Sequence, residues 1–417
     1  MATKGRTCAW LVVAVTAGVA CQGTSASRND AGVDAGANAA LCASTTAACA
    51  LPSIETTPSF PHLLGIRDGQ LYFVTADYDG EVDRSHMKLW RRSTSGGPDD
   101  LLYAQVQEGW MLEALLDATG ANVYAVYLRP RFQDFVLWRL SLTSPIVATR
   151  IDDSADVLAG PLVSSPAMDI EMVGDDLYYS VAFSMASERY AQSGLYRVPS
   201  GGGAPVRVLA AEHGRGIGTQ GGDVYFSGFG IEGTGGGAAL VRVSAEGGPP
   251  IVLLTDPPPT PTFSSVPMSF VVGPMGIFWA RSRHATFSTQ MELAHLPLEG
   301  GAPRALFALP ETSTSNDVDE EAYALGVRSF TTGSPTLPTA PIYFDVIHWA
   351  FGELGTTDLM RLTLDDTAPT TVLHVDHIGA VGAVAFDGPH LYFAYSGDAN
   401  SSGYGIGKVD RCGCPAP

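Results

Sequence analysis

Residues 174–179 read Gly-Asp-Asp-Leu-Tyr-Tyr, and they are followed by Leu-Tyr-Arg at 195–197, Gly-Gly at 201–202 and Val-Arg-Val-Leu at 206–209. Asp and Gly favour a tight turn, and alternating side chains suit strands that bury one residue and expose the next. Paired glycines supply the positive φ angles of a short hairpin. Together with an apolar strand before the Asp/Gly turn, this unit predicts four short antiparallel strands.

The same order of segments recurs along the chain. Each copy places an aromatic residue at the centre of its second strand, and successive copies stand 47 to 65 residues apart. These aromatic residues are Tyr72, Tyr124, Tyr178, Tyr225, Phe278, Tyr343 and Tyr392. In six of the seven units, the motif of the third strand ends with arginine or histidine. These six residues are Arg91, Arg139, Arg197, Arg242, His295 and Arg361. The seventh unit has a weaker match to this motif, which ends with Lys408.

Seven copies of a four-stranded unit predict an all-β fold, a β-propeller of seven four-stranded blades. One such sheet cannot bury both of its faces, whereas seven sheets packed radially can. Rings of six or eight blades are alternatives. Two stacked β-sandwich domains are a further alternative, but sandwiches do not repeat one strand order seven times.

The repeat resembles those of the bacterial TolB-like and YWTD-like propellers over residues 63–411. Their units also combine an Asp-Gly turn, an aromatic-rich strand, an apolar-aromatic-Arg strand and a glycine turn. The resemblance implies a propeller and implies no particular function.

The seventh unit stops after Lys408 without a fourth strand. We therefore expect residues near 47–54 to complete the last blade and to close the ring, because a borrowed strand pairs an otherwise open sheet edge. Four cysteines lie at the two ends to be joined: Cys42, Cys49, Cys412 and Cys414. They predict disulfides that run from the N-terminal to the C-terminal cysteines, with the pairing left open; a zinc site of four thiolates is the rival.

The first 20 residues have the features of a signal peptide. Lys4 and Arg6 precede an apolar run at residues 9–17, and small residues at 18–20 precede Cys21. Small residues before a cysteine resemble a bacterial lipobox, which implies a lipidated Cys21 and a cell-envelope lipoprotein; plain secretion is the alternative. Residues 21–47 are rich in small and polar residues and are expected to form a disordered tether. Residues 48–417 are expected to form a single propeller domain.

The net charge of −19 argues against nucleic acid as a partner, because nucleic-acid binders need a basic face for the phosphates. We expect a monomer that contacts a membrane only through its lipid anchor.

One acidic segment suggests a cation site. The alternating oxygen-bearing residues Thr75, Asp77, Asp79, Glu81 and Asp83 flank Gly80 and resemble a calcium loop whose first Asp is replaced by Thr. A solvated acidic turn is the alternative. We name no other cofactor.

The long connections are expected on one face of the ring, for example at 75–87, 127–136 and 152–168, with a long turn at 332–341 on the other. Long loops on a rigid frame usually carry binding. The sequence contains no His-Glu-x-x-His, Gly-x-Ser-x-Gly, phosphate-loop or dinucleotide motif, so we name no catalytic residue. The sequence therefore favours a non-catalytic binding or scaffolding module for an envelope protein or glycan. The alternative is an envelope hydrolase or lyase with an axial, metal-assisted site.

Overall fold

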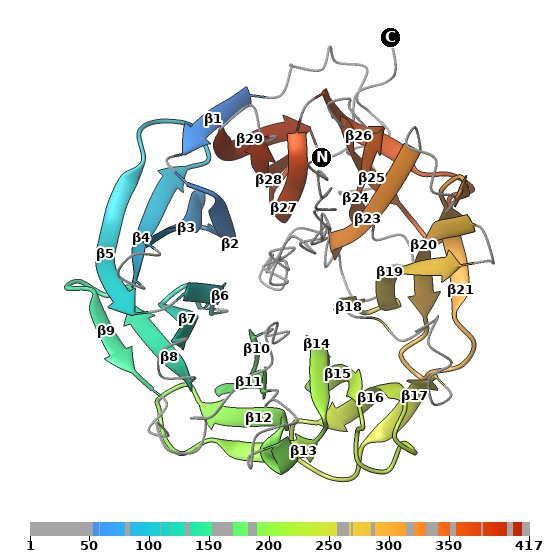
Figure 1. Ribbon diagram of the computed structural model, residues 1–417. Coiled ribbons are helices and arrows are strands. Elements are labelled where there is room, and N and C mark those ends of the chain that lie inside the picture. Colours follow the sequence, from blue (N-terminus) through green and yellow to red (C-terminus); the bar gives the residue numbers. More distant parts are fainter. Residues whose placement is uncertain are drawn as a thin grey trace, which may run out of the picture.

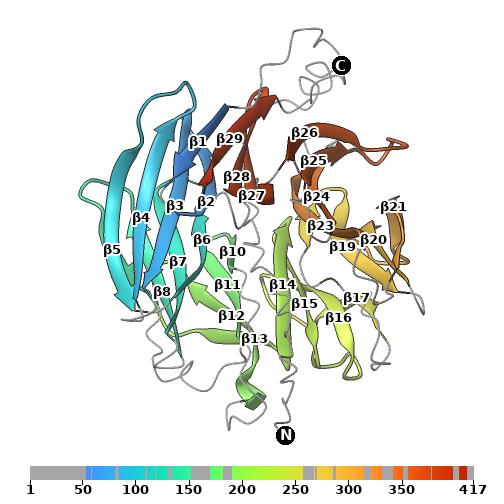
Figure 2. The same ribbon diagram turned by 45° about the horizontal axis from the view of Figure 1, so that its top comes forward.

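The protein is a ring of seven small antiparallel sheets (Figures 1 and 2). The computed structural model describes residues 53–57, 59–79, 84–108, 110–117, 119–129, 134–151, 170–181, 190–256, 267, 270–284, 288–313, 321–330, 341–350, 356–376, 378–397 and 403–410. In the described part, no helix is long and apolar enough to cross a membrane.

Six blades contain four strands in chain order from the axis to the rim, and in the seventh the rim strand comes from the N-terminal side (Figure 1). Blade 1 is β2 (Pro61–Arg67), β3 (Gln70–Asp79), β4 (Arg84–Ser93) and β5 (Asp100–Glu108). Blade 2 is β6 (Trp110–Leu116), β7 (Asn122–Arg129), β8 (Asp134–Ser141) and β9 (Val147–Arg150). Blade 3 is β10 (Ile170–Val173), β11 (Asp176–Val181), β12 (Gly194–Pro199) and β13 (Val206–Ala210), with the 3-10 turn η2 (Tyr190–Gln192) between β11 and β12. Blade 4 is β14 (His213–Gln220), β15 (Asp223–Phe229), β16 (Ala238–Ser244) and β17 (Ile251–Thr255).

The remaining blades follow the same plan. Blade 5 is β18 (Val271–Gly273), β19 (Gly276–His284), β20 (Ser288–Leu296) and β21 (Arg304–Ala308), and the short β22 (Thr312–Ser313) also pairs with β20. Blade 6 is β23 (Glu321–Phe330), β24 (Ile342–Ala350), β25 (Thr356–Leu362) and β26 (Thr370–Asp376). Blade 7 is β27 (Ile378–Asp387), β28 (His390–Gly397), β29 (Tyr404–Asp410) and, from the N-terminal side, β1 (Ser53–Thr57).

The ring is closed as the sequence predicts, by an N-terminal strand in the last blade. Strand β1 pairs antiparallel with β29, so that Ser53 lies opposite Lys408 and Thr57 opposite Tyr404. The described strand shares Ser53 and Ile54 with the predicted residues 47–54. Residues 47–52 lie outside the described part of the chain.

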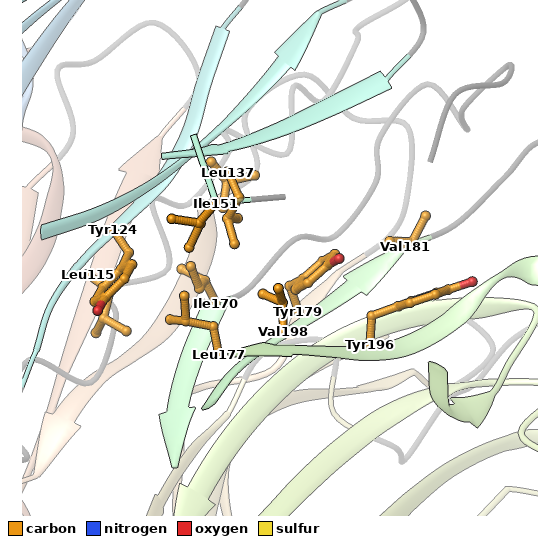
Figure 3. Packing of buried hydrophobic residues seen from close by; sticks show 11 residues of the cluster. Leu115, Tyr124, Leu137, Ile151, Ile170, Leu177, Tyr179, Val181, Tyr196 and Val198 are labelled. Carbon is orange, nitrogen blue, oxygen red and sulfur yellow. The ribbon is translucent and has the colours of Figure 1, made fainter. Parts of the chain in front are cut away.

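The core lies between blades, and it explains the pair of residues at the centre of each second strand. In β11, Tyr178 and Tyr179 point to opposite faces of the sheet. Tyr179 belongs to a buried cluster between blades 2 and 3 that also contains Leu115 and Ile170 (Figure 3). Tyr178 packs with Phe226 between blades 3 and 4. Each blade therefore buries both faces, and each face needs a neighbouring blade.

A second set of contacts, which we call the turn-carbonyl clamp, joins neighbouring blades through hydrogen bonds. The tyrosine of one second strand and the basic residue of the adjacent third strand donate to one backbone carbonyl of the next blade. Between blades 7 and 1, the Tyr392 hydroxyl and Lys408 Nζ lie 3.0 and 3.2 Å from the carbonyl oxygen of Thr94. The Lys408 ammonium also lies 5.4 Å from the centre of the Tyr392 ring.

The clamp recurs in other blades. Between blades 3 and 4, Arg197 Nη1 and the Tyr178 hydroxyl lie 3.2 and 3.5 Å from the carbonyl oxygen of Ala245. Between blades 2 and 3, Arg139 Nη1 lies 3.3 Å from the carbonyl oxygen of Ser200. Thr94, Ser200 and Ala245 occupy the same place, at the start of the turn between the third and fourth strands.

The same turn residues also tie their own blade together. The backbone N–H groups of Thr94, Ser200 and Ala245 donate to the carbonyl oxygens of Gly69, Asp175 and Gly222, respectively, in the turn between the first and second strands. Each clamp residue thus links both short turns of its own blade to the blade before it. The repeated aromatic residue, basic residue and short turn therefore act together to join neighbouring blades.

Replacing Tyr392 by Phe should remove one clamp hydrogen bond and keep the packing of the ring. We expect the free energy of unfolding to fall by about 1 kcal/mol, a typical net value for one intramolecular hydrogen bond. Urea unfolding followed by tryptophan fluorescence measures the change. Tyr404→Phe is the matched control, because Tyr404 lies on the neighbouring strand β29 with 38% of its surface exposed. Equal effects of the two substitutions would contradict the clamp.

Candidate functional site

The two faces of the ring are built differently. On the first, which we call the turn face, first strands join second strands and third strands join fourth strands. These turns are short in most blades and use glycines with positive φ angles, including Gly69, Gly96, Gly174, Gly222 and Gly247. On the second, which we call the loop face, second strands join third strands and each blade joins the next. The longest connections between described strands, at 151–169 and 256–270, start and end there.

Several predicted loops of the loop face are extended hairpins instead. The segment 75–87 was expected to be a loop, yet β3 runs to Asp79 and β4 starts at Arg84, with Asp77 opposite His86. The segment 127–136 is likewise shortened by β7 and β8. Polar and buried residues keep alternating in β4, where Ser85 and Met87 are buried while Arg84 and His86 are exposed. Strand pairing therefore continues beyond the body of the blade.

The extended hairpin changes the setting of the predicted calcium ligands. Thr75 is buried, and its hydroxyl accepts a hydrogen bond from Trp90 Nε1 at 2.9 Å. Thr75, Asp77 and Asp79 are alternate residues of an extended strand, whereas a calcium loop wraps its ligands around one ion. Glu81 and Asp83 lie outside the described residues, so calcium binding stays a prediction. The described residues form no group of three or more His, Cys, Asp or Glu that could hold a metal.

Cysteine-based predictions also fall outside the described part of the chain. Cys21, the proposed lipidation site, and the four disulfide candidates Cys42, Cys49, Cys412 and Cys414 lie there, as do residues 332–340 of the predicted long turn at 332–341. Only the strands that flank the terminal cysteines, β1 and β29, are described.

One described loop shows how a loop-face connection is held. Residues 230–237 join β15 to β16, and Gly230, Gly233, Gly235 and Gly236 have positive φ angles. Thr234 Oγ1 donates to the carbonyl oxygen of Ile231 at 2.8 Å, and the Ile231 side chain is buried. Glu232 N donates to the carbonyl oxygen of Ala210 in blade 3. This loop is a fixed surface that spans two blades.

Charged and titratable residues occur on the innermost strands of four successive blades, which no sequence motif indicated. They are His62 on β2, Glu113 on β6, Glu171 on β10 and His213 on β14. Glu113 and Glu171 are only 4% and 5% exposed. Glu113 Oε1 accepts a hydrogen bond from Ala114 N at 3.1 Å. These residues are separated by whole blades in sequence, and only the ring brings their strands around one axis.

The environment of His62 keeps its imidazole neutral at neutral pH. Part of the residue remains accessible, but desolvation among protein atoms lowers the pKa of His62 to about 4. Its ring meets Phe60 edge to face, with the ring centres 5.8 Å apart, and Phe60 in turn meets Tyr404 of β29. His62 therefore lies where the first blade meets the last.

Sequence reasoning also missed a nearly buried ion pair on blade 5. Arg281 Nη2 and Nε both lie 2.8 Å from Glu292 Oε2, and the two residues face each other across β19 and β20. The sequence indicates this ion pair only through an arginine and a glutamate at directly opposite positions of two strands. That match can be recognised only when the register between β19 and β20 is known. The pair compensates both charges and leaves neither available for chemistry.

No family model matches the chain, and no curated protein matches its sequence. The β-propeller domain of the Trilobed protease from Pyrococcus furiosus is similar with a TM-score of 0.49 and 10% identity, over 85% of this chain and 95% of that chain. Puromycin hydrolase is similar with a TM-score of 0.48 and 12% identity, over 85% of this chain and 52% of that chain. The acylaminoacyl peptidase of Pyrococcus horikoshii is similar with a TM-score of 0.44 and 12% identity, over 83% of this chain and 49% of that chain.

This chain thus spans about half the length of the last two proteins. At such identities and scores, the activities of these proteins do not transfer to this chain. The seven-bladed architecture rests on the strand pairing of the chain itself.

The setting of His62 predicts a loss of stability in mild acid. Its folded-state pKa lies below the unfolded value of 6.5, so the unfolded chain binds the proton more readily. The stabilising contribution is complete above pH 6.5 and is lost as the pH falls toward 4. The pKa difference between 6.5 and about 4 corresponds to at most about 3.4 kcal/mol of unfolding free energy. We expect about 1–2 kcal/mol, because part of the residue remains accessible to solvent.

Unfolding midpoints measured from pH 7.5 to 4 test this expectation. His62→Gln should flatten the decline, while His295 and His390, whose pKa values are also lowered by desolvation, should keep part of it. His86→Gln, at an exposed position on β4, is the control. If the His62→Gln variant declines as steeply as the wild type, desolvation of His62 is not the cause.

Proposed function

We propose that this chain is a non-catalytic binding or scaffolding module of the cell envelope, and that its loop face presents a protein- or glycan-binding surface. The proposal includes an exported lipoprotein with TolB-like or YWTD-like repeats, tethered through Cys21. One observation supports it: in the described residues, the turn-carbonyl clamps that join neighbouring blades lie on the turn face.

The backbone groups of the turn face have structural partners. In blades 1, 3 and 4, one turn residue gives its N–H to its own blade and its carbonyl oxygen to the blade before it. A partner that pulled on these turns would disturb contacts between blades. Such a surface suits a frame better than a binding site.

The loop face projects extended hairpins and carries the longest connections. Hairpins such as β3–β4 extend the rigid sheet outward, and a fixed loop such as 230–237 spans two blades. Preorganised surfaces bind with a smaller loss of conformational freedom than flexible ones. The acidic net charge favours partners other than nucleic acids.

One observation favours the alternative, an envelope hydrolase or lyase with an axial site. Glu113 and Glu171 are buried carboxylates on neighbouring inner strands, with His62 and His213 on the strands to either side. Buried carboxylates and imidazoles are the usual general acids and bases. A metal-assisted form of this site would need ligands from outside the described residues, because those described form no suitable group.

Partner capture with a shortened hairpin tests the binding proposal. In the full-length protein, residues 77–86 are replaced by Asn-Gly. Ala76 and Met87 are already register partners, and Asn-Gly is the preferred two-residue hairpin turn, so the remaining parts of β3 and β4 should stay paired. The end of β5, Val106–Glu108, loses its partners on β4. After cross-linking in the envelope, we expect at least a tenfold loss of a defined partner.

The matched control reverses two exposed charges on the turn face, Glu246→Lys and Asp365→Lys, neither of which belongs to a clamp described above. It should capture the partner as the wild type does. Capture lost with the control but kept with the shortened hairpin would assign binding to the wrong face and overturn the proposal.

A further inference from the structure

The seam between blades 5 and 6 lacks the usual clamp donors. Those donors are register partners on the second and third strands of a blade, as Tyr178 and Arg197 are in blade 3. In blade 5 the same register positions hold Phe278 and His295. Phe278 has no polar hydrogen, and His295 Nε2 lies 2.8 Å from the carbonyl oxygen of Met275, in a turn of its own blade. Neither side chain therefore supplies the clamp hydrogen bond to blade 6.

The acceptor side of the same seam is also changed. Thr363 directly follows β25, so it occupies the place that Thr94, Ser200 and Ala245 have in their blades. Its N–H donates to Asp366 Oδ2 at 2.7 Å, and its carbonyl oxygen accepts a hydrogen bond from Asp366 N at 3.3 Å. Both backbone groups of Thr363 are thus used inside one turn of blade 6.

Apolar side chains fill this seam. Val271 and Phe278 of blade 5 form one buried cluster with Ile342 of blade 6, and Leu293 and Phe344 belong to a second cluster across the same seam. Apolar contacts are not directional, whereas hydrogen bonds are. The seam therefore depends on keeping what it buries uncharged and well packed.

His295 is a titratable residue in this seam. It is 6% exposed, and its ring lies against Phe278 with the ring centres 4.8 Å apart. Gly276 makes room for it, because a Cβ at that position would lie 2.4 Å from His295 Nε2. His295 Nδ1 is buried and has no hydrogen-bond partner among the described residues. This setting fits the neutral tautomer that carries its one proton on Nε2, since the Met275 carbonyl can only accept.

The groups around His295 disfavour a second proton. Desolvation by burial lowers the pKa of His295, the hydrogen bond to the Met275 carbonyl raises it, and the charge of Arg304 lowers it. Arg304 lies directly opposite His295, on β21. On the side of blade 6, Asp365 and Asp366 are exposed, and Asp366 already accepts a backbone hydrogen bond. A proton on Nδ1 would therefore be buried beside a like charge, without an acceptor in the described part of the chain.

We propose that this seam is an acid-triggered joint, at which protonation of His295 loosens the contact between blades 5 and 6 while the clamped seams stay closed. Burying an unpaired charge is costly, so the imidazolium favours the loosened state, in which water reaches it. The loosened state binds the proton more readily than the closed one. The joint is therefore closed above pH 6.5 and loosens as the pH falls through the lower pKa that His295 has in the closed seam.

The rest of the ring can hold its shape while this joint loosens. The clamps on Thr94, Ser200 and Ala245 join blades 7 to 1, 2 to 3 and 3 to 4, and none of them includes a histidine. A change at His295 is therefore expected to stay local, as sub-global openings of native proteins do.

Hydroxyl-radical footprinting of the full-length protein from pH 7.5 to 4.5, read by mass spectrometry, tests the joint. The reporter is Phe344 in the seam between blades 5 and 6, and the matched reference is Phe226 in the seam between blades 3 and 4; both are 0% exposed. We expect the modification of Phe344 relative to Phe226 to rise at least about threefold on acidification. The pH range stays above the pKa of His62, which is about 4.

Two variants test whether His295 is the trigger. His295→Gln takes up no proton, and its amide can still donate to the Met275 carbonyl, so Phe344 should stay protected throughout. Arg304→Gln removes a like charge at an exposed position and should move the rise toward higher pH. His390→Gln is the matched control, because burial also lowers the pKa of His390, but it lies in blade 7, which is clamped to blade 1.

Equal rises at Phe344 and Phe226, or no rise at Phe344, would overturn the joint. A rise that persists unchanged in His295→Gln would overturn His295 as its trigger. If His295→Gln is already reactive at pH 7.5, the comparison of the two phenylalanines in the wild type and the shift with Arg304→Gln decide. An unshifted rise in Arg304→Gln would then count against His295. None of these results depends on which partner the loop face binds.

Discussion

The shared carbonyl oxygen of the turn-carbonyl clamp is the contact on which the ring depends. A four-stranded blade has two apolar faces, and neither can remain in water without a neighbour. Packing alone fixes which faces meet, but hydrogen bonds are directional and fix how they meet. The Tyr392 and Lys408 donors on the Thr94 carbonyl join the last blade to the first, and the equivalent donors on Ser200 and Ala245 join blades 2 to 3 and 3 to 4.

This constraint divides the molecule into a structural face and an available face. The short turns serve the ring, so the chain can vary without cost to the frame only where second strands join third strands and where blades join one another. Blade 5 shows that one clamp can change: Phe278 and His295 replace the Tyr and Arg, and His295 Nε2 pairs with the Met275 carbonyl of its own blade at 2.8 Å. The ring therefore rests on several clamps together.

The sequence predicted what repeats and missed what does not. Seven copies of one strand pattern, with an aromatic residue in the second strand and in most copies a basic residue in the third, were enough to predict the blades. Closure by an N-terminal strand was predicted correctly, because the seventh unit lacks a fourth strand of its own. The hairpin β3–β4 was taken for a loop, because its acidic residues hid the strand alternation. Glu113 and Glu171 were invisible as neighbours, because only the ring relates their strands.

Hydrogen exchange of the native protein tests the closed ring most directly. If β1 completes blade 7, the amides that β1 directs toward β29 should exchange only when the whole ring opens, with protection equal to that of β11 in blade 3. Exchange of residues 53–57 at the rate of an unstructured chain, while β27, β28 and β29 stay protected, would contradict closure by the N-terminal strand.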